Sequence, residues 1–174
     1  PVFSCRMAKA VSPTSVAIKV TANDGHGQTA SDIFVLSVTS VPGIVMRGTA
    51  AGDTLIDRPT GDDTVYGGAG NDFIFGNTGN NVLYGEDGND QLFSTAGADS
   101  LDGGLGDDVY YVYDNTNAVV VEAAGAGTDR MYTTIDRTLP ANVEMLSLQG
   151  AAARGIGNAL NNQIDVRRQR PVDR

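Results

Sequence analysis

Aspartate recurs at a nine-residue interval through the middle of the chain. The sixth position of seven successive units is filled by a carboxylate or, once, an amide: Asp53, Asp63, Asp72, Asn81, Asp90, Asp99 and Asp108. The fourth position is glycine in every unit except the first, which has Ala51. Carboxylate and carbonyl oxygens are the hard ligands that Ca²⁺ takes, six to eight of them at about 2.3–2.6 Å. The spacing therefore predicts a row of cation sites.

Each unit reads as a six-residue turn followed by a three-residue strand. The units span 48–56, 58–66, 67–75, 76–84, 85–93, 94–102 and 103–111, with Asp57 inserted after the first. The eighth position is aliphatic in six units and is Tyr110 in the seventh, which predicts a narrow core. Two units make one eighteen-residue coil of a parallel stack. The turns of the first, third, fifth and seventh units then lie on one side, the odd edge, and those of the second, fourth and sixth on the other, the even edge.

The electrostatics of this segment favour a bound cation. Residues 48–111 hold twelve Asp or Glu and one basic residue, Arg58, a net charge of -11, while the whole chain carries -9. Adjacent strands lie about 4.8 Å apart, so stacked turns bring carboxylates together. Two charges about 5 Å apart repel by roughly 1 kcal/mol in water and by roughly 3–4 kcal/mol at an effective dielectric near 20. A divalent cation between the turns reverses this repulsion, and we expect folding of the segment to depend on it.

The units match the pattern G-G-x-G-x-D-x-U-x, where U is a large aliphatic residue, and the segment resembles the RTX (hemolysin-type) calcium-binding repeats. The resemblance implies an all-β fold, a parallel β-roll or β-helix, with Ca²⁺ as the cofactor. It implies export by a type I secretion system and a secreted, extracellular or bacterial cell-surface location. The predicted metal-site residues are Gly67, Gly68, Gly70, Asp72, Gly85, Asp87, Gly88, Asp90, Gly103, Gly104, Gly106, Asp108, Asp53, Asp63, Asn81 and Asp99.

The two edges follow the pattern unequally. The odd-edge turns GGAGND, GEDGND and GGLGDD stay close to it, whereas two even-edge turns lack the first glycine and a third has Asn81 in place of a carboxylate. We expect well-formed sites between units three and five and between units five and seven, and a weaker one between units one and three. The even edge should bind weakly or not at all. Replacing Asp90, which would serve two ions, should reduce calcium binding more than replacing Asp63.

The segment before the repeats predicts a β-hairpin. Ser15–Thr21 and Ile33–Val38 alternate apolar and polar residues around the turn residues 23–27. The stretch IKVTANDGHGQTASDIFVLSV resembles the last hairpin of bacterial cadherin-like, immunoglobulin-type sandwich domains. The resemblance implies that residues 1–43 are the C-terminal remnant of such a domain plus a linker, and that the chain is cut from a larger protein.

The segment after the repeats predicts more β-structure. We expect residues 44–111 to form the β-roll, 112–165 a β-rich continuation or cap, and 166–174 a disordered tail. Within the cap, a hairpin is expected around residues 115–117, two further strands around Pro140, and a weak repeat at 157–165.

Composition excludes several functions. The acidic charge argues against nucleic acid as a partner, and no apolar run is long enough to span a membrane. The single histidine, His26, falls in a predicted turn, the single cysteine, Cys5, falls in an N-terminus expected to fray, and catalytic motifs are absent. We therefore predict a non-enzymatic calcium-binding module of a secreted, adhesin-like protein.

An alternative is the C-terminal secretion or stabilising module of a secreted metalloprotease, lipase or polysaccharide-modifying enzyme. Aromatic residues at positions seven and nine leave open a carbohydrate or cell-surface partner.

Overall fold

The computed structural model describes residues 2–7, 15–23, 29–37, 43–113, 117–150 and 154–167. These fall into two compact units, Pro1–Val41 and Pro42–Arg174. Within the described ranges no helix is long and apolar enough to cross a membrane.

The first unit is an antiparallel sheet in the order β1-β2-β3. Its strands are β1 (Val2–Met7), β2 (Ser15–Asn23) and β3 (Thr29–Ser37), and β2 pairs with β3 from Ser15–Ser37 to Asn23–Thr29. The hairpin prediction is confirmed, although turn residues 24–28 lie outside the described ranges. Cys5 was expected in a frayed end, but it lies in β1 opposite Val20, because β1 adds to the edge of the hairpin.

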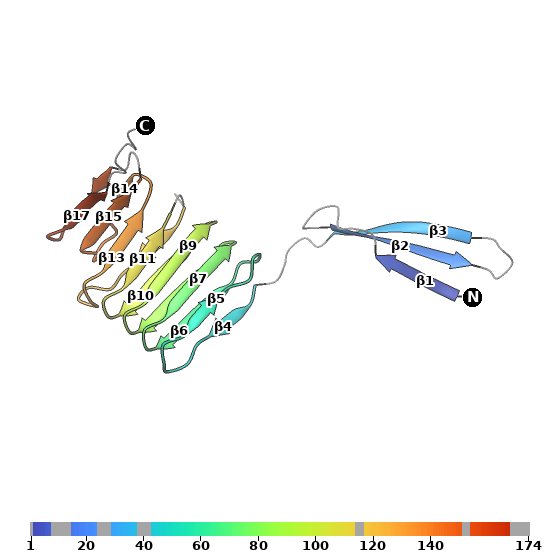
Figure 1. Ribbon diagram of the computed structural model, residues 1–174, viewed down its shortest axis with the longest axis horizontal. Helices are drawn as coiled ribbons and strands as arrows, with labels where there is room; N and C mark the ends of the chain where they lie inside the picture. Colours follow the sequence, from blue (N-terminus) through green and yellow to red (C-terminus); the bar gives the residue numbers. More distant parts are fainter. Residues whose placement is uncertain are drawn as a thin grey trace, which may run out of the picture. The chain divides into compact units, whose positions relative to one another are not determined.

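The second unit is a parallel β-roll in which the chain alternates between two sheets (Figure 1). The five-stranded sheet contains β4 (Val45–Arg47), β6 (Thr64–Ala69), β8 (Val82–Asp87), β10 (Ser100–Leu105) and β12 (Val119–Val121). The seven-stranded sheet contains β5 (Thr54–Ile56), β7 (Phe73–Thr78), β9 (Gln91–Ala96), β11 (Val109–Val112), β13 (Arg130–Thr133), β15 (Met145–Gln149) and β17 (Gln163–Arg167). The short strands β14 (Arg137–Thr138) and β16 (Gly155–Ile156) pair with each other.

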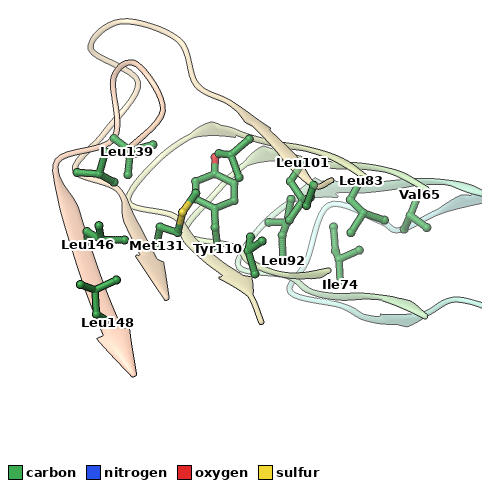
Figure 2. Close-up of a cluster of buried hydrophobic side chains, with 14 residues drawn as sticks. Val65, Ile74, Leu83, Leu92, Leu101, Tyr110, Met131, Leu139, Leu146 and Leu148 are labelled. Atoms are coloured by element: carbon green, nitrogen blue, oxygen red, sulfur yellow. The ribbon is translucent and has the colours of Figure 1, made fainter. Parts of the chain in front are cut away.

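The register confirms two units per coil. Leu83 lies between Val65 and Leu101 in one sheet, and Leu92 lies between Ile74 and Tyr110 in the other. These eighth-position side chains are fully buried and fill the space between the sheets (Figure 2). The all-β, parallel β-roll prediction is therefore confirmed, and the same pairing holds the turns of each edge in line.

Residues after 111 differ from the hairpin prediction. The strands β11 and β12 flank residues 115–117 but do not pair with each other, since β11 pairs with β13 and β12 with β10. The roll instead continues through β13, β15 and β17 in parallel. Inward side chains such as Met131 and Leu146 extend the core and favour this continuation. The weak repeat at 157–165 is confirmed as a further coil ending in β17.

The tail predicted at 166–174 is only partly covered by the structure. Its first two residues belong to β17, because the strand pairing with β15 runs on to Arg167. Residues 168–174 lie outside the described ranges.

Candidate metal centre

Sixth-position side chains form a continuous hydrogen-bonded ladder along the odd edge. In each step, the Oδ1 atom of one aspartate accepts a hydrogen bond from the backbone N–H of the sixth residue one coil earlier. Asp53 N donates to Asp72 at 2.7 Å, Asp72 N to Asp90 at 2.7 Å, and Asp90 N to Asp108 at 2.8 Å. These bonds hold the three accepting carboxylates, Asp72, Asp90 and Asp108, within the turns, where all three are buried.

The second oxygen of each of the three accepting carboxylates has no partner. The Oδ2 atoms of Asp72, Asp90 and Asp108 are buried without a hydrogen bond, and each residue is at most 2% exposed. A buried carboxylate oxygen left without a donor costs several kcal/mol, and proteins resolve this by pairing it or binding a metal. The odd edge therefore presents a column of anionic oxygens that lack a positive partner.

The first-position glycines leave room around these oxygens. A Cβ built at Gly67 would collide with Asp72 Oδ2 and lie 2.6 Å from the carbonyl oxygen of Gly85, in the next coil. A Cβ built at Gly85 would collide with Asp90 Oδ2 and the carbonyl oxygen of Gly103. Carboxylate and carbonyl oxygens from successive coils thus converge beside a residue that has no side chain. This donor set is the one that calcium prefers.

The fourth-position glycines serve the turn itself. Gly70, Gly88 and Gly106 have φ values of 103°, 141° and 129°, a region that side chains other than glycine rarely adopt. A Cβ at Gly88 would collide with the carbonyl oxygen of Gly70 below it. Glycine is thus required for successive turns to stack closely enough to share a ligand.

Burial makes the odd-edge carboxylates weak acids when no cation is present. Desolvation raises the pKa of Asp90 to about 6, with the negative charge of Asp72 adding to the effect. Desolvation and the charge of Asp90 raise the pKa of Asp108 to about 7, and the pKa of Asp72 is also raised by burial. The ionised stack is therefore unfavourable by itself.

The even edge has the same hydrogen-bonded ladder, but other side chains of the protein compensate part of its negative charge. Asp63 N donates to Asn81 and Asn81 N to Asp99, each at 2.9 Å. Asp63 forms an ion pair with Arg58 at 3.2 Å, and Asp99 Oδ2 accepts a 2.6 Å hydrogen bond from Ser94 Oγ. Asn81 carries no charge. Arg58 and Ser94 thus compensate part of the charge of this edge, while Asp63 Oδ2 and Asn81 Nδ2 are buried without a hydrogen-bond partner. With Asn81 in place of a carboxylate, the even edge needs a cation less than the odd edge does.

The inserted residue Asp57 adds to this compensation. Although burial acts to raise it, the neighbouring Asp57 carboxyl, the hydrogen bond from Ile44 N and the Arg58 guanidinium hold the pKa of Asp63 below its usual value. Burial and the contact with Asp63 raise the pKa of Asp57 to about 6. Asp57 therefore binds a proton more readily than Asp63 does.

Two other predicted site residues lie in different surroundings. Asp53 is half-buried, and its Oδ2 atom accepts hydrogen bonds from the N–H and hydroxyl of Thr49 at 2.6 and 2.8 Å. The side chain of Asp87 is exposed, while its carbonyl oxygen accepts a hydrogen bond from Gly70 N at 2.7 Å. The remaining predicted positions, Gly68 and Gly104, lie in odd-edge turns with positive φ.

Sequence reasoning missed the continuation of the ladder. Asp108 N donates to Asp129 Oδ1 and Asp129 N donates to Glu144 Oε2, each at 2.8 Å. Residues 124–132, AGAGTDRMY, keep glycine at positions two and four, Asp129 at six and Met131 at eight. This motif was visible in the sequence but falls outside the nine-residue frame.

The comparisons with known proteins agree with this geometry. Residues 60–92 and 84–113 match the family described as RTX calcium-binding nonapeptide repeat (4 copies). A stretch of 62 residues is 45% identical to the endo-1,3-1,4-beta-glycanase ExsH of Rhizobium meliloti (strain 1021), and one of the same length is 40% identical to EglC of that organism, which has the same enzyme name. Each match covers 36% of this chain and 13% of the relative, so the similarity is confined to a small part of those enzymes.

Proposed function

Since residues 60–113 are RTX calcium-binding repeats within a parallel β-roll, we propose that this chain is a module that folds when it binds calcium outside the cell. The observation that carries the proposal is the column of buried, unpartnered Oδ2 atoms on the odd edge. Ordering a glycine-rich segment opposes folding, and bringing these carboxylates together opposes it further.

The residues that would hold the ions are those on which the odd-edge turns converge. Asp72 and Asp90, with first-position glycine carbonyls, would form one site, and Asp90 and Asp108 would form the next. Bound Ca²⁺ supplies the positive charge that the buried oxygens lack. Asp90 would serve both sites, because it lies between the other two aspartates in the ladder.

The other positions support weaker binding. Thr49 already satisfies Asp53 Oδ2, which favours a weak site between units one and three. On the even edge Arg58 and Ser94 stabilise the acidic side chains, so we propose that Asp63, Asn81 and Asp99 bind calcium poorly.

Circular dichroism of the 174-residue chain tests the coupling of folding to calcium. We expect a β-sheet spectrum in calcium and its loss in excess EGTA, with recovery when calcium is returned. Excess magnesium is the matched control, because Mg²⁺ demands stricter octahedral geometry and retains water. A spectrum that stays the same in EGTA would contradict the proposal.

We propose a secreted or cell-surface parent protein for this module, exported by a type I system while the roll is unfolded in the low-calcium cytosol. The β2–β3 hairpin and its cadherin-like sequence favour an adhesin-like parent. The similarity to two glycanases favours the second candidate, an accessory module of a secreted polysaccharide-modifying enzyme. Further sandwich domains before residue 1 of the parent would support the first candidate, and a catalytic domain would support the second.

We propose a carbohydrate partner for the stacked aromatic side chains of the seven-stranded sheet. Phe93 stacks on Tyr111 with ring centroids 4.0 Å apart, and Tyr111 stacks on Tyr132 at 5.1 Å. A glycan array probed with the calcium-loaded chain tests it, and binding that is unchanged in the F93A variant would contradict it. We take the β-roll itself to be non-catalytic.

A further inference from the structure

A three-carboxylate cluster lies where the regular repeats end. One oxygen from each of Asp108, Glu122 and Asp129 lies within 4.8 Å of the other two, and each residue is at most 7% exposed. Two oxygens on opposite sides of one calcium ion are about 4.6–5.2 Å apart, twice the usual ligand distance. All three carboxylates therefore fit around a single ion.

The register explains how Glu122 reaches this place. Asp102 of β10 pairs with Val121 of β12, so Glu122 follows Val121 at the level of Gly103. Elsewhere on the odd edge this is the first-position glycine, beside which a carboxylate and a carbonyl oxygen converge. At this level of the roll Glu122 takes the place of the first-position glycine. The position that elsewhere leaves space beside the site therefore contributes a carboxylate ligand.

Tyr110 holds Glu122 in position. The Tyr110 hydroxyl accepts a 2.8 Å hydrogen bond from Gly103 N and donates one to Glu122 Oε2. Burial and the neighbouring Glu122 raise the pKa of Tyr110 well above its usual value, so the phenol stays protonated and remains a donor. Ala123 N donates to Glu122 Oε1 at 2.9 Å. Tyr110, the aromatic exception among the seven eighth-position residues, thus forms a hydrogen bond with Glu122.

The cluster lacks positive charge. The Oδ2 atoms of Asp108 and Asp129 are buried without a hydrogen-bond partner, and each residue is 1% exposed. Within the described ranges no Lys or Arg side chain forms an ion pair with the three carboxylates. Desolvation raises the pKa of Glu122 to about 7 and that of Asp129 to about 6.

We propose that Asp108, Glu122 and Asp129 form a calcium site that is distinct from the sites between regular repeats and fills before them. It brings three carboxylates to one ion, whereas the spaces between Asp72, Asp90 and Asp108 bring two each. The inference rests on the calcium binding proposed above and adds a ligand, Glu122, that the nine-residue motif does not contain. Filling it first would fix the C-terminal end of the odd edge, on which the preceding coils stack.

Calcium titration of the whole chain by calorimetry tests this site, with E122Q as the variant and E86Q as the matched control. The amide introduced by E122Q keeps an oxygen for Tyr110 and removes one charge, while Glu86 lies exposed in an odd-edge turn. We expect E122Q to weaken the tightest binding step by at least about tenfold and E86Q to leave it unchanged. If E122Q does not fold in calcium, D129N replaces it, because its amide oxygen preserves the ladder bond from Asp108 N.

Terbium, an oxygen-seeking ion that replaces calcium, gives a second measurement. The chain contains no tryptophan, so emission is excited through tyrosine, and Tyr110 contacts a ligand of this site. The terbium emission that develops at the lowest ion concentrations should be weaker in E122Q than in the wild-type chain and unchanged in E86Q. Calcium binding by E122Q with wild-type affinity and stoichiometry would overturn this site alone. A wild-type chain that binds no calcium would overturn the proposed function as well.

Discussion

Replacing Asp90 by asparagine should destabilise the roll in calcium but not in its absence. Asn81 shows that an amide at the sixth position accepts the same ladder bond, at 2.9 Å from Asp63 N, so D90N preserves the backbone of the turn. The substitution removes the buried charge whose Oδ2 atom has no partner. In EGTA this should stabilise the roll or leave it unchanged, because burial opposes that charge. In calcium the same charge is a ligand, and its loss should destabilise the roll.

The expected size follows from the place of Asp90 between Asp72 and Asp108. If the loss of one carboxylate weakens the binding of one calcium ion by about a hundredfold, that ion contributes about 2.7 kcal/mol less to the free energy of unfolding at saturating calcium. Two ions share Asp90, so the total is about 5 kcal/mol. Since domains are stable by about 5–15 kcal/mol, this loss should be large enough to unfold the roll or nearly so.

Urea unfolding followed by circular dichroism measures the change in the free energy of unfolding caused by D90N, once in saturating calcium and once in excess EGTA. If the EGTA form is too unstable for a baseline, the osmolyte sucrose added equally to all samples restores one. The matched control is D99N on the even edge, where Ser94 already satisfies the carboxylate. D99N should change stability by a similar amount in both conditions. Equal losses for D90N and D99N in calcium, or a D90N loss that is the same in EGTA, would refute the reasoning.

Four further predictions test the same edge and the core. Calcium affinity measured by calorimetry should rise between about pH 5 and pH 7.5, because folded pKa values of about 6 for Asp90 and about 7 for Asp108 make protons compete with the ion. For the same reason the calcium-free roll, kept folded by sucrose, should lose stability as pH rises from the unfolded carboxyl value near 4 through these folded values. A gain in stability over that range would contradict the assignment. G85A should abolish calcium-dependent stabilisation in urea titrations, because its methyl group meets Asp90 Oδ2. G76A on the even edge meets Leu83 methyl carbons at 3.0 and 3.2 Å and Asn81 Nδ2 at 3.5 Å, and should be milder. L92A should lower the free energy of unfolding in calcium by about 2–5 kcal/mol, as expected for a fully buried leucine, and a loss below about 1 kcal/mol would show that the core is not packed as described.

The nine-residue spacing predicted the roll and its register because both depend on backbone geometry alone. Once two units close a coil, Leu83 must stack between Val65 and Leu101, and sixth-position side chains must line up along an edge. The residue types in the turns also predicted weaker calcium binding on the even edge, because two of its turns lack the first glycine and the third has Asn81. It could not show that Arg58 and Ser94 supply the compensation, because those contacts depend on side-chain geometry within the turn.

The nine-residue spacing no longer predicts the structure after Tyr111, because the turns change length there while the strands continue to pair in parallel. Asp108 and Asp129 are 21 residues apart, against 18 for Asp90 and Asp108. The polar stretch before Val119 has the local pattern of a hairpin turn, but burial of Val120 and Met131 in the extended core favours the parallel arrangement. Tertiary packing thus decided the fold where local pattern indicated otherwise.

The most direct test of the account is a crystal structure of the chain grown with calcium, with anomalous scattering used to locate the ions. We expect ion density on the odd edge between Asp72 and Asp90 and between Asp90 and Asp108, with the even edge empty. Well-ordered turns in which these three carboxylates contact no ion would contradict the claim that calcium holds the coils together.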